Sequence, residues 1–385
     1  MIFLLISVIV FVGYAFLITA ITIGWLKLKG FKKNDSLPTI KVSIIVAARN
    51  EAGNIEMLLN SLLAQDYPLH LLEIIIVDDH SSDNTSSLVE EFIAKSKETQ
   101  NLKLIKLTED EGSGKKAAIN QGIQALKGEL IVITDADCIA GNKWILTLAS
   151  YFAEHHPQMI LGPVSMTDGG SFFGKLQSLE FISLISAAAG SCSVGFPILA
   201  NGANIAFTRQ AYDSCGGFTG NMQFPSGDDM FLMTSIKKKF GAKAIRFLRS
   251  EEAIVYTPAI LGFKAFIQQR LRWVSKSRGY TDPTLIISSI LVFLTNGWLV
   301  LTGLAAIVNP GFFKLFLGLY VIKMIIDLPL MLSYSRLQKS RPLIALFPLM
   351  ELLNAVYTLL IGIAGNIGKY EWKGRRVSNK GMERG

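Results

Sequence analysis

The sequence predicts an α/β protein in which a mainly parallel sheet is covered by helices, with added transmembrane and interfacial helices. Short apolar, β-branched runs alternate with helical patterns between residues 40 and 260, as they do in parallel sheets. Acidic residues follow the ends of several of these runs. Long apolar stretches flank the segment at residues 1–26, 284–308, 311–334 and 343–366. Each of these stretches is long enough to cross a bilayer.

The composition narrows the class of protein. Half of the 385 residues are hydrophobic, which excludes an ordinary, wholly soluble protein. The net charge is +8, but no basic stripe interleaved with aromatic residues predicts a nucleic-acid partner. The three cysteines, Cys138, Cys192 and Cys215, have the spacing of neither a disulfide framework nor a zinc site. This cysteine usage agrees with a reducing cytoplasm.

Residues 1–26 are predicted to form an uncleaved N-terminal transmembrane anchor. The alternative is a cleaved signal peptide, but the segment has no cationic start and its apolar run exceeds a signal core. Lys27, Lys29, Lys32 and Lys33 follow it directly. By the positive-inside rule, these lysines place the globular segment on the cytoplasmic face of the cell (inner) membrane.

Residues 40–260 are predicted to form the cytoplasmic domain. Runs with the length and composition of buried strands occur at 41–47, 72–77, 102–107 and 130–133. Helical patterns occur at 53–64, from near Ser86, and at 115–126. In parallel sheets, ligands bind beyond the carboxyl ends of the strands. The residues that follow these runs are therefore the candidates for a site.

Two apolar stretches are predicted to lie at the membrane surface. Residues 171–199 contain Lys175 and Glu180, which would be costly in lipid, so an interfacial amphipathic helix is favoured over a span. Residues 261–280 interleave aromatic and basic side chains, which predicts a second amphipathic interfacial helix.

Residues 284–366 are predicted to form a membrane region of about three apolar segments, followed by a basic tail at 367–385. One anchor and three further spans would put this tail outside the cell, whereas its lysines and arginines favour the inside. A re-entrant or interfacial segment would resolve the conflict, and 343–366, with Pro342 and Pro348, is one candidate. The sequence leaves the number of spans open.

Asp135 and Asp137 follow an apolar run and place two carboxylates on the same side of an extended segment. Such oxygen ligands suit Mg²⁺ or Mn²⁺, which would bridge a diphosphate and neutralise a leaving group. Acidic turns are common at strand ends, so the pair alone is a weak signal. The prediction of a metal site becomes stronger when the pair is considered with the other acidic motifs, in the order in which they occur along the chain.

Asp78 and Asp79 also end an apolar run. They would serve either to terminate the strand and cap the next helix, or to bind the imide N–H of a uracil ring. Lys115 follows a glycine-rich turn that fails the P-loop template, because Lys116 stands where Ser or Thr is required. Lys115 is thus either a cation beside a diphosphate at a helix N-terminus or a solvated helix start.

Asp228 and Asp229 open a predicted helix, where the dipole alone would favour carboxylates. Two adjacent aspartates facing a hydroxyl would also suit general-base chemistry. Asp229 is the predicted base, and Asp228 is predicted to contact the acceptor or orient the base.

Gln269, Arg272 and Trp273 share one helical face by their spacing. Trp273 would be an interface anchor and Arg272 a lipid contact, or the guanidinium would meet a pyrophosphate while the indole stacks on a sugar. The upstream aspartates favour the second interpretation.

Taken in order, these motifs resemble the inverting, membrane-associated glycosyltransferases of family 2, which include cellulose, chitin, hyaluronan and poly-N-acetylglucosamine synthases. The resemblance covers roughly residues 40–280. It rests on the run 42–51, Val77-Asp78-Asp79, Gly114-Lys115, Asp135-Ala136-Asp137, Gly202-Ala203-Asn204, Gly216-Gly217-Phe218, Gly227-Asp228-Asp229, and Gln269 with Arg272 and Trp273.

The resemblance implies a GT-A fold, which is Rossmann-like, and a nucleotide-sugar donor held with Mg²⁺ or Mn²⁺. It implies that the uridine is lined by Ala48, Glu51 and Asp79. It assigns Asp135 and Asp137 to the ribose, diphosphate and metal, with Asp229 as the base. Direct attack at the anomeric carbon would invert its configuration.

The chain departs from the family pattern at two positions and in its membrane part. Ala47 stands where the family usually has proline, and Asp228 where glutamate is more common. The few spans disfavour a private polymer channel, and so favour a lipid-linked or short glycan acceptor.

The predicted function is therefore transfer of a hexose or N-acetylhexosamine from a nucleotide-sugar, with UDP expected, to a lipid or saccharide hydroxyl at the cytoplasmic face. One alternative is a catalytically inactive membrane scaffold of the same fold, which an intact set of motifs argues against. The other alternative is a nucleotidyltransferase. Such an enzyme would require a glycine- and arginine-rich N-terminal phosphate loop, and residues 47–51 do not form one.

Overall fold

The computed structural model describes residues 2–33, 38–95, 100–224, 226–367, 370–373, 375–378 and 381–382. The chain divides into two compact units. The helical unit contains residues 1–28, 168–199 and 259–370. The sheet unit contains residues 29–167, 200–258 and 371–385. The chain therefore leaves the sheet unit at residue 168 and returns to it at residue 200, and it enters it again after residue 370.

The sheet unit is built on a seven-stranded sheet in the order β3-β2-β1-β4-β8-β6-β9. Its strands are β1 (Val42–Ala48), β2 (Leu72–Asp78), β3 (Leu102–Lys106), β4 (Leu130–Asp135), β6 (Met159–Leu161), β8 (Ile205–Thr208) and β9 (Ile245–Phe247). The first four are parallel, while β8 is antiparallel to β4 and β6. The predicted mainly parallel α/β sheet is confirmed.

The register of β1 brings the candidate residues to one edge. Ala48 pairs with Asp78, and Ala47 pairs with Asp135, so β1, β2 and β4 end at nearly the same level. All of β1 except Ala47 is buried, and β2 and β4 are buried apart from Glu73 and Asp135. Strands that are buried on both faces read as continuous apolar runs, which is why the sequence predicted them within a few residues.

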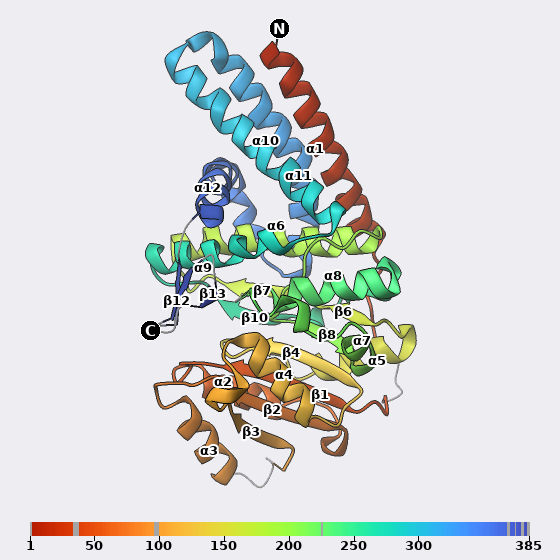
Figure 1. Cartoon of the computed structure of the whole chain (residues 1–385). Helices are drawn as coiled ribbons and strands as arrows, with labels where there is room; N and C mark the ends of the chain where they lie inside the picture. Colours follow the sequence, from red (N-terminus) through yellow and green to blue (C-terminus); the bar gives the residue numbers. More distant parts are fainter. Residues whose placement is uncertain are drawn as a thin grey trace. The chain divides into compact units, whose positions relative to one another are not determined.

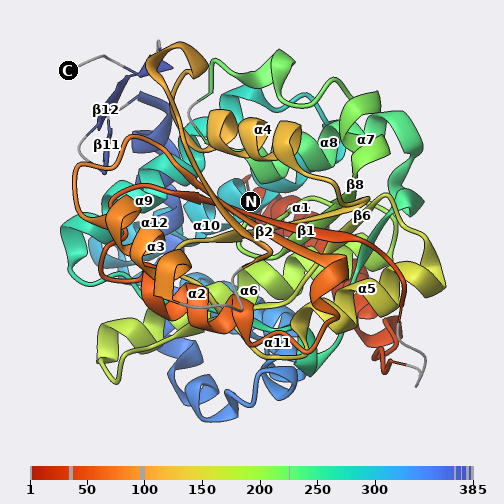
Figure 2. The ribbon, with the colours of Figure 1, turned by 90° about the horizontal axis from the view of Figure 1, so that it is seen from below.

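Helices α2 (Ile55–Leu63), α3 (Thr85–Lys95), α4 (Lys115–Ala125), α5 (Trp144–His155), α7 (Arg209–Ser214) and α8 (Asp228–Phe240) surround this sheet (Figures 1 and 2). Helix α4 approaches β1 closely, because a Cβ on Gly122 would lie 2.7 Å from Ile45 Cγ2. A small sheet of β5 (Ile139–Ala140), β10 (Val255–Pro258) and β7 (Val164–Thr167) completes the unit, with β11 (Tyr370–Trp372), β12 (Arg375–Ser378) and β13 (Gly381–Met382) near the chain end.

The helical unit contains α1 (Ile2–Lys27), α6 (Phe172–Ser193), α9 (Phe263–Ser275), α10 (Pro283–Val308), α11 (Phe313–Leu337) and α12 (Phe347–Ile367). In the described part of the chain, four helical stretches are long and apolar enough to cross a membrane: Ile2–Lys27, Pro283–Val308, Pro310–Leu337 and Pro342–Gly365. Helix α6 is not one of them, in line with the expected interfacial helix.

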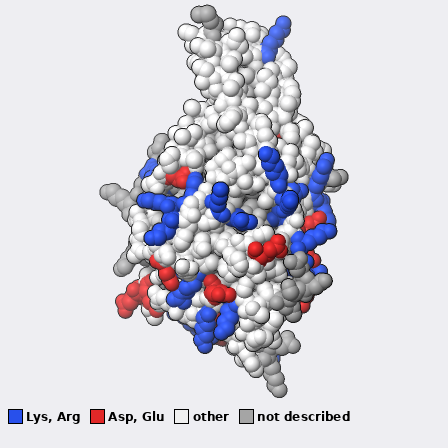
Figure 3. Space-filling model, turned by 90° about the vertical axis from the view of Figure 1, so that its right-hand side faces the viewer, with Lys and Arg blue, Asp and Glu red and all other residues white. Residues whose placement is uncertain are grey.

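Helices α1, α10 and α11 run alongside one another, whereas α12 lies across them and is seen nearly end on in Figure 1. Helix α1 also crosses α6 at two glycines, where a Cβ on Gly24 would lie 2.2 Å from the carbonyl oxygen of Gly190. In the space-filling view, the surface of the long helices is almost free of charged side chains (Figure 3).

One charged cluster is nevertheless buried among these helices. Lys323 of α11 is 1% exposed, and its ammonium lies 2.8 Å from Asp327 Oδ2 and 2.7 Å from Glu351 Oε1. The Tyr14 hydroxyl of α1 donates to Asp327 at 2.8 Å. Because Glu351 belongs to α12, the cluster joins α1, α11 and α12 through polar contacts.

Candidate active site

The loops after β1 and β2 are locked together by an arginine. Arg49 Nη1 donates to the carbonyl oxygens of Asp79 at 2.6 Å and His80 at 2.7 Å. Asn50 and His80 adopt left-handed backbone conformations, with φ of 52° and 55°, so both loops turn sharply beyond their strands. The Asn50 side chain then accepts a hydrogen bond from the Ser82 amide at 2.8 Å. The two loops form a single, cross-linked edge.

Glu51 is held in this edge from three sides. Its amide donates to Thr85 Oγ1 at 2.8 Å, and its carboxylate accepts from Asn54 Nδ2 at 2.7 Å. The same carboxylate forms an ion pair with Lys373. The Lys373 ammonium also donates to the carbonyl oxygen of Arg49 at 2.7 Å. Lys373 lies in the predicted basic tail, and no local sequence pattern connects it to Glu51, which is 322 residues away.

The two aspartates after β2 have different partners. Asp78 accepts from the Ser81 amide at 3.2 Å, as expected of a residue that ends a strand. Asp79 is 2% exposed, and its amide donates to the carbonyl oxygen of Ala48 at 2.8 Å. Its carboxylate accepts from the Gly114 amide at 3.0 Å. Asp79 therefore joins the β1 and β2 edge to the N-terminus of α4, where a carboxylate is favoured.

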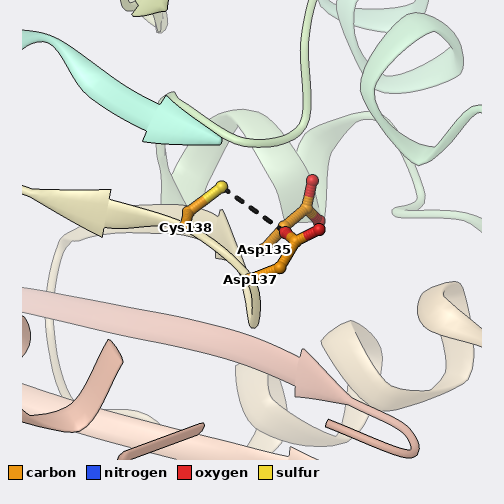
Figure 4. Close-up of side chains that lie close together, drawn as sticks. All are labelled: Asp135, Asp137 and Cys138. Atoms are coloured by element: carbon orange, nitrogen blue, oxygen red, sulfur yellow. Dashed lines mark hydrogen bonds between the residues drawn. The ribbon is translucent and has the colours of Figure 1, made fainter. Parts of the chain in front are cut away.

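Asp135, Asp137 and Cys138 offer ligand atoms within 4.8 Å of one another (Figure 4). Burial, together with the carboxylates of Asp135 and Glu51, raises the pKa of Asp137 to about 6. Cys138 Sγ donates to Asp137 Oδ1 at 3.7 Å, and burial raises the thiol pKa well above its ordinary value. Two crowded carboxylates beside a neutral thiol fit a hard divalent cation better than a soft metal.

Lys115 connects the acidic pair Asp135 and Asp137 to the pair Asp228 and Asp229. Its ammonium lies 2.6 Å from Asp135 Oδ1 and 3.3 Å from Asp228 Oδ2. Burial opposes the charge, but the carboxylates of Asp135, Asp228 and Asp229 outweigh it and hold the Lys115 pKa above its ordinary value. The side chain is only 18% exposed, which distinguishes it from a solvated helix start.

Asp228 and Asp229 form the first turn of α8, after Gly227 with a φ of 88°. Asp229 accepts from the Met230 amide at 2.7 Å and from the Gly202 amide at 3.2 Å. A Cβ on Gly202 would lie 2.8 Å from Lys115 Nζ and 3.2 Å from Asp228 Oδ2. The absence of a side chain at Gly202 therefore lets the backbone reach the base candidate.

Asn204 belongs to the same motif as Gly202, but its described side-chain contacts support the fold and do not involve the acidic residues. Its Nδ2 donates at 2.8 Å to the carbonyl oxygens of Pro163 and Ala253, and its Oδ1 accepts from Trp144 Nε1 at 3.0 Å. It is 1% exposed. Asn204 thus holds β8 against neighbouring segments of the sheet unit.

Gln269, Arg272 and Trp273 lie on α9 in the helical unit, so their joint role with the acidic residues stays a prediction. Arg270, which lies between them, was not among the residues that the sequence predicted for the site. Its guanidinium pairs with Glu180 of α6 at 3.1 and 2.6 Å. It also lies over the rings of Phe266 and Trp273, at 4.5 and 4.1 Å from their centroids.

Residues 43–217 match the model of the family described as glycosyl transferase family 2. The chain carries a family 2 glycosyltransferase domain. The match covers the loops after β1 and β2, the start of α4, and Asp135 and Asp137, and it ends before α8. The predicted resemblance to family 2 glycosyltransferases is confirmed for residues 43–217.

Two curated relatives of this family 2 domain differ in the products that their names state. The chain is 30% identical over 178 residues to a beta-monoglucosyldiacylglycerol synthase of Trichormus variabilis, covering 46% of this chain and 37% of that protein. It is 30% identical over 155 residues to a poly-beta-1,6-N-acetyl-D-glucosamine synthase of Staphylococcus epidermidis, covering 40% and 35% respectively. The aligned stretches thus span less than half the length of the curated relatives.

A solved structure supports the predicted GT-A fold over most of the chain. A mannosyltransferase from Pyrobaculum calidifontis, in complex with GDP-Man and Mn²⁺, superposes with a TM-score of 0.55. The similarity covers 92% of this chain and 99% of that one, at 19% sequence identity. At this identity the similarity concerns the fold alone.

Proposed function

We propose that the protein is a membrane-bound inverting glycosyltransferase that moves a sugar from a nucleotide-sugar to a lipid or saccharide hydroxyl. One observation carries the proposal. Lys115 joins Asp135, on the donor side, to Asp228, beside the candidate base, at 2.6 and 3.3 Å. A family 2 domain whose donor-side and base-side acids form one charged cluster has the parts that direct sugar transfer needs.

The donor would bind along the shared edge of β1, β2 and β4. Ala48, Glu51 and Asp79 would line the uridine, and Asp135 and Asp137 would face the ribose and diphosphate. The two carboxylates would also hold Mg²⁺ or Mn²⁺, which when bound neutralises the diphosphate and the leaving nucleotide. In this proposal Lys115 supplies a further positive charge beside the diphosphate.

Asp229 would accept the proton of the acceptor hydroxyl. Its carboxylate is oriented by the amides of Gly202 and Met230, and the α8 N-terminus favours its ionised form. The acceptor oxygen would then bond to the anomeric carbon as the bond from that carbon to the phosphate oxygen breaks. The electron pair of the broken bond leaves with the nucleotide diphosphate, and the anomeric configuration inverts.

For Gln269, Arg272 and Trp273, binding of the acceptor or the diphosphate stays the role that the sequence predicts. A lipid or short glycan acceptor is favoured by the small number of membrane helices. The relative named as a glucosyldiacylglycerol synthase supports a lipid acceptor, whereas the relative named as a poly-N-acetylglucosamine synthase supports a saccharide acceptor.

The sheet unit is proposed to lie at the cytoplasmic face of the cell membrane. The chain leaves this unit through α6 alone and returns to it, so a single crossing by α6 would place two parts of one sheet on opposite sides. The chain later leaves through α9 to α12 and returns with Lys373 bound to Glu51. An even number of crossings therefore separates residue 258 from Lys373.

Helices α10 and α11 supply two crossings, so α12 is proposed to lie within the membrane or its surface without traversing it. The transverse course of α12 in Figure 1 supports this arrangement. With α1, the chain would cross the bilayer three times. The basic residues near the end of the chain would then remain inside, as the positive-inside rule favours.

The proposed function is tested by nucleotide release from a panel of nucleotide-sugars. Purified membranes carrying the wild type, Asp229→Asn or Asp213→Asn would be supplied with lipid extract, with Mn²⁺ or with chelator. We expect donor-specific release that needs metal and falls about 10²–10⁴-fold in Asp229→Asn. Asp213→Asn is the matched control, because Asp213 is 58% exposed and pairs only with the surface residue Arg209 in the described contacts. No release with any donor would overturn the proposal.

A further inference from the structure

A second lysine at the start of α4, Lys116, is buried, but its contacts are with residues to which the proposed function assigns no role. Lys116 is 4% exposed, although it follows the charged Lys115 directly. Its ammonium donates to the carbonyl oxygens of Asn221 at 2.6 Å and Phe224 at 2.9 Å. It also lies 4.6 Å from the centroid of the Phe231 ring.

This position is costly for a lysine. Removing an ammonium from water is unfavourable unless it is well paired, and the first turn of a helix is the end at which a cation is disfavoured. An apolar side chain would fill the same space without these penalties. The contacts that Lys116 makes are therefore specific to its charge and its donor hydrogens.

The two carbonyl groups belong to the loop that leads into Gly227, Asp228 and Asp229. The same loop packs on α8, because the rings of Phe224 and Phe231 lie 5.1 Å apart. Lys116 contacts both members of this pair, one through its carbonyl oxygen and the other through its ring. It thereby holds the loop against the first turns of α8, which carry the acidic pair.

The N-cap Gly114 and the first two residues of α4 thus contact three parts of the site. The amide of Gly114 donates to Asp79, and Lys115 pairs with Asp135 and Asp228. Lys116 binds the loop ahead of Asp229. One helix start connects the nucleotide edge, the diphosphate acids and the base.

We propose that Lys116 is a positioning residue that fixes Asp229 relative to the donor-binding edge. This inference rests on the proposed function, since it concerns the same site. It predicts that loss of Lys116 impairs transfer much more than it impairs nucleotide binding.

Lys116→Met tests the proposal, because it keeps the length of the side chain and removes its charge and donor hydrogens. We expect kcat to fall about 10–100-fold, as a small misplacement of a catalytic group does. The dissociation constant of UDP or GDP with Mn²⁺ should stay within about twofold of the wild-type value. Lys116→Arg, which keeps hydrogen donors, should recover part of the lost kcat. Lys106→Met is the matched control, since Lys106 is 52% exposed.

Hydrogen exchange supplies a readout that does not depend on activity. In Lys116→Met, peptides covering residues 219–224 should exchange faster, while those covering β1 and β2 should not change. An unchanged kcat would overturn the proposal. So would a parallel loss of kcat, nucleotide affinity and thermal stability that Lys116→Arg does not recover, because Lys116 would then be structural only. A wild type without transfer activity would overturn the proposed function instead, and the exchange data would still decide whether Lys116 holds the loop.

Discussion

Gly202 leaves little room between the backbone and the charged cluster of Lys115, Asp135 and Asp228. An added Cβ would lie 2.8 Å from Lys115 Nζ, so alanine would force the ammonium away from Asp228. We expect Gly202→Ala to lower kcat about tenfold or more, because the base and its neighbours would shift. The thermal midpoint should change little, since the displaced atom is the end of a side chain.

Gly141→Ala is the control for this substitution, because a Cβ at Gly141 would meet nothing within 4 Å. Steady-state kinetics with the donor found in the nucleotide-release assay would provide the comparison. Equal kcat values for the two alanine variants would show that the short distance between Gly202 and the Lys115 ammonium does not matter for activity.

The contact between Lys373 and Glu51 offers a second prediction for a single residue. Without Lys373, the Glu51 carboxylate would add an uncompensated negative charge near Asp137, at the edge where the nucleotide is proposed to bind. We expect Lys373→Met to weaken nucleotide binding about 3–10-fold, in the range of a partly exposed charge pair. Calorimetry at low and high salt would measure it, and a dissociation constant unchanged at low salt would contradict the expectation.

At the level of residues, the sequence predicted the acids but not their connections. Each of Asp79, Asp135 and Asp229 has an ordinary structural explanation by itself, and they stand out because together they follow the order of motifs that resembles family 2 glycosyltransferases. Lys373 and Lys116 could not be found in this way. Their roles depend on contacts with residues far away in the chain, and a lysine in a basic tail or beside another lysine has no distinctive local pattern.

Among the elements, α6 and α9 depend on one buried ion pair. Arg270 is 1% exposed in its side chain and Glu180 is 11% exposed. Removing one partner from such a pair leaves an unpaired buried charge, which costs about 3–5 kcal/mol. We expect Arg270→Met to lower the thermal inactivation midpoint clearly, whereas Lys264→Met, on an exposed part of α9, should not.

The double variant Glu180→Met with Arg270→Met separates the loss of the ion pair from the cost of leaving one buried charge without its partner. It removes both charges together, so it should recover much of the stability lost in Arg270→Met. A double variant as unstable as the sum of its single variants would show that the two side chains act independently.

The elements themselves were largely predictable, since buried parallel strands and long apolar helices have strong patterns. The polar residues inside α6 argue against a span, and Glu180 has a partner, Arg270, that explains its place. The sequence left the course of α12 open. Its composition is that of a spanning helix, while the basic tail and Pro342 and Pro348 made 343–366 one candidate for a re-entrant or interfacial segment. The return of the chain to the sheet unit is a further reason to propose that α12 does not traverse the bilayer.

For the whole molecule, the proposed arrangement predicts which segments face the outside of the cell. The loop between α10 and α11 should be external, and the segment after α1 should be internal. We expect a membrane-impermeant maleimide to label Gly311→Cys on intact cells. Lys32→Cys should react only after the cells are opened. Both positions are exposed, while Cys138 and Cys192 are buried, which limits background labelling from these two residues.

The reverse pattern, with Lys32→Cys labelled on intact cells, would overturn the cytoplasmic location of the sheet unit. Labelling of both positions on intact cells would contradict the three crossings. The native protein, labelled in parallel, measures the contribution of Cys215, which is partly exposed.

The cluster of Lys323, Asp327, Glu351 and Tyr14 has a consequence for how the protein is made. Helix α11 emerges during synthesis with a cation and a carboxylate that lipid solvates poorly, while Glu351 is still to be synthesised. The contact with Tyr14 requires α1, which in the proposed arrangement would already lie in the membrane by then. A nascent chain that stops before α12 would therefore pair Lys323 with Asp327 but would lack the second carboxylate contact, which Glu351 supplies and which ties α12 to α11.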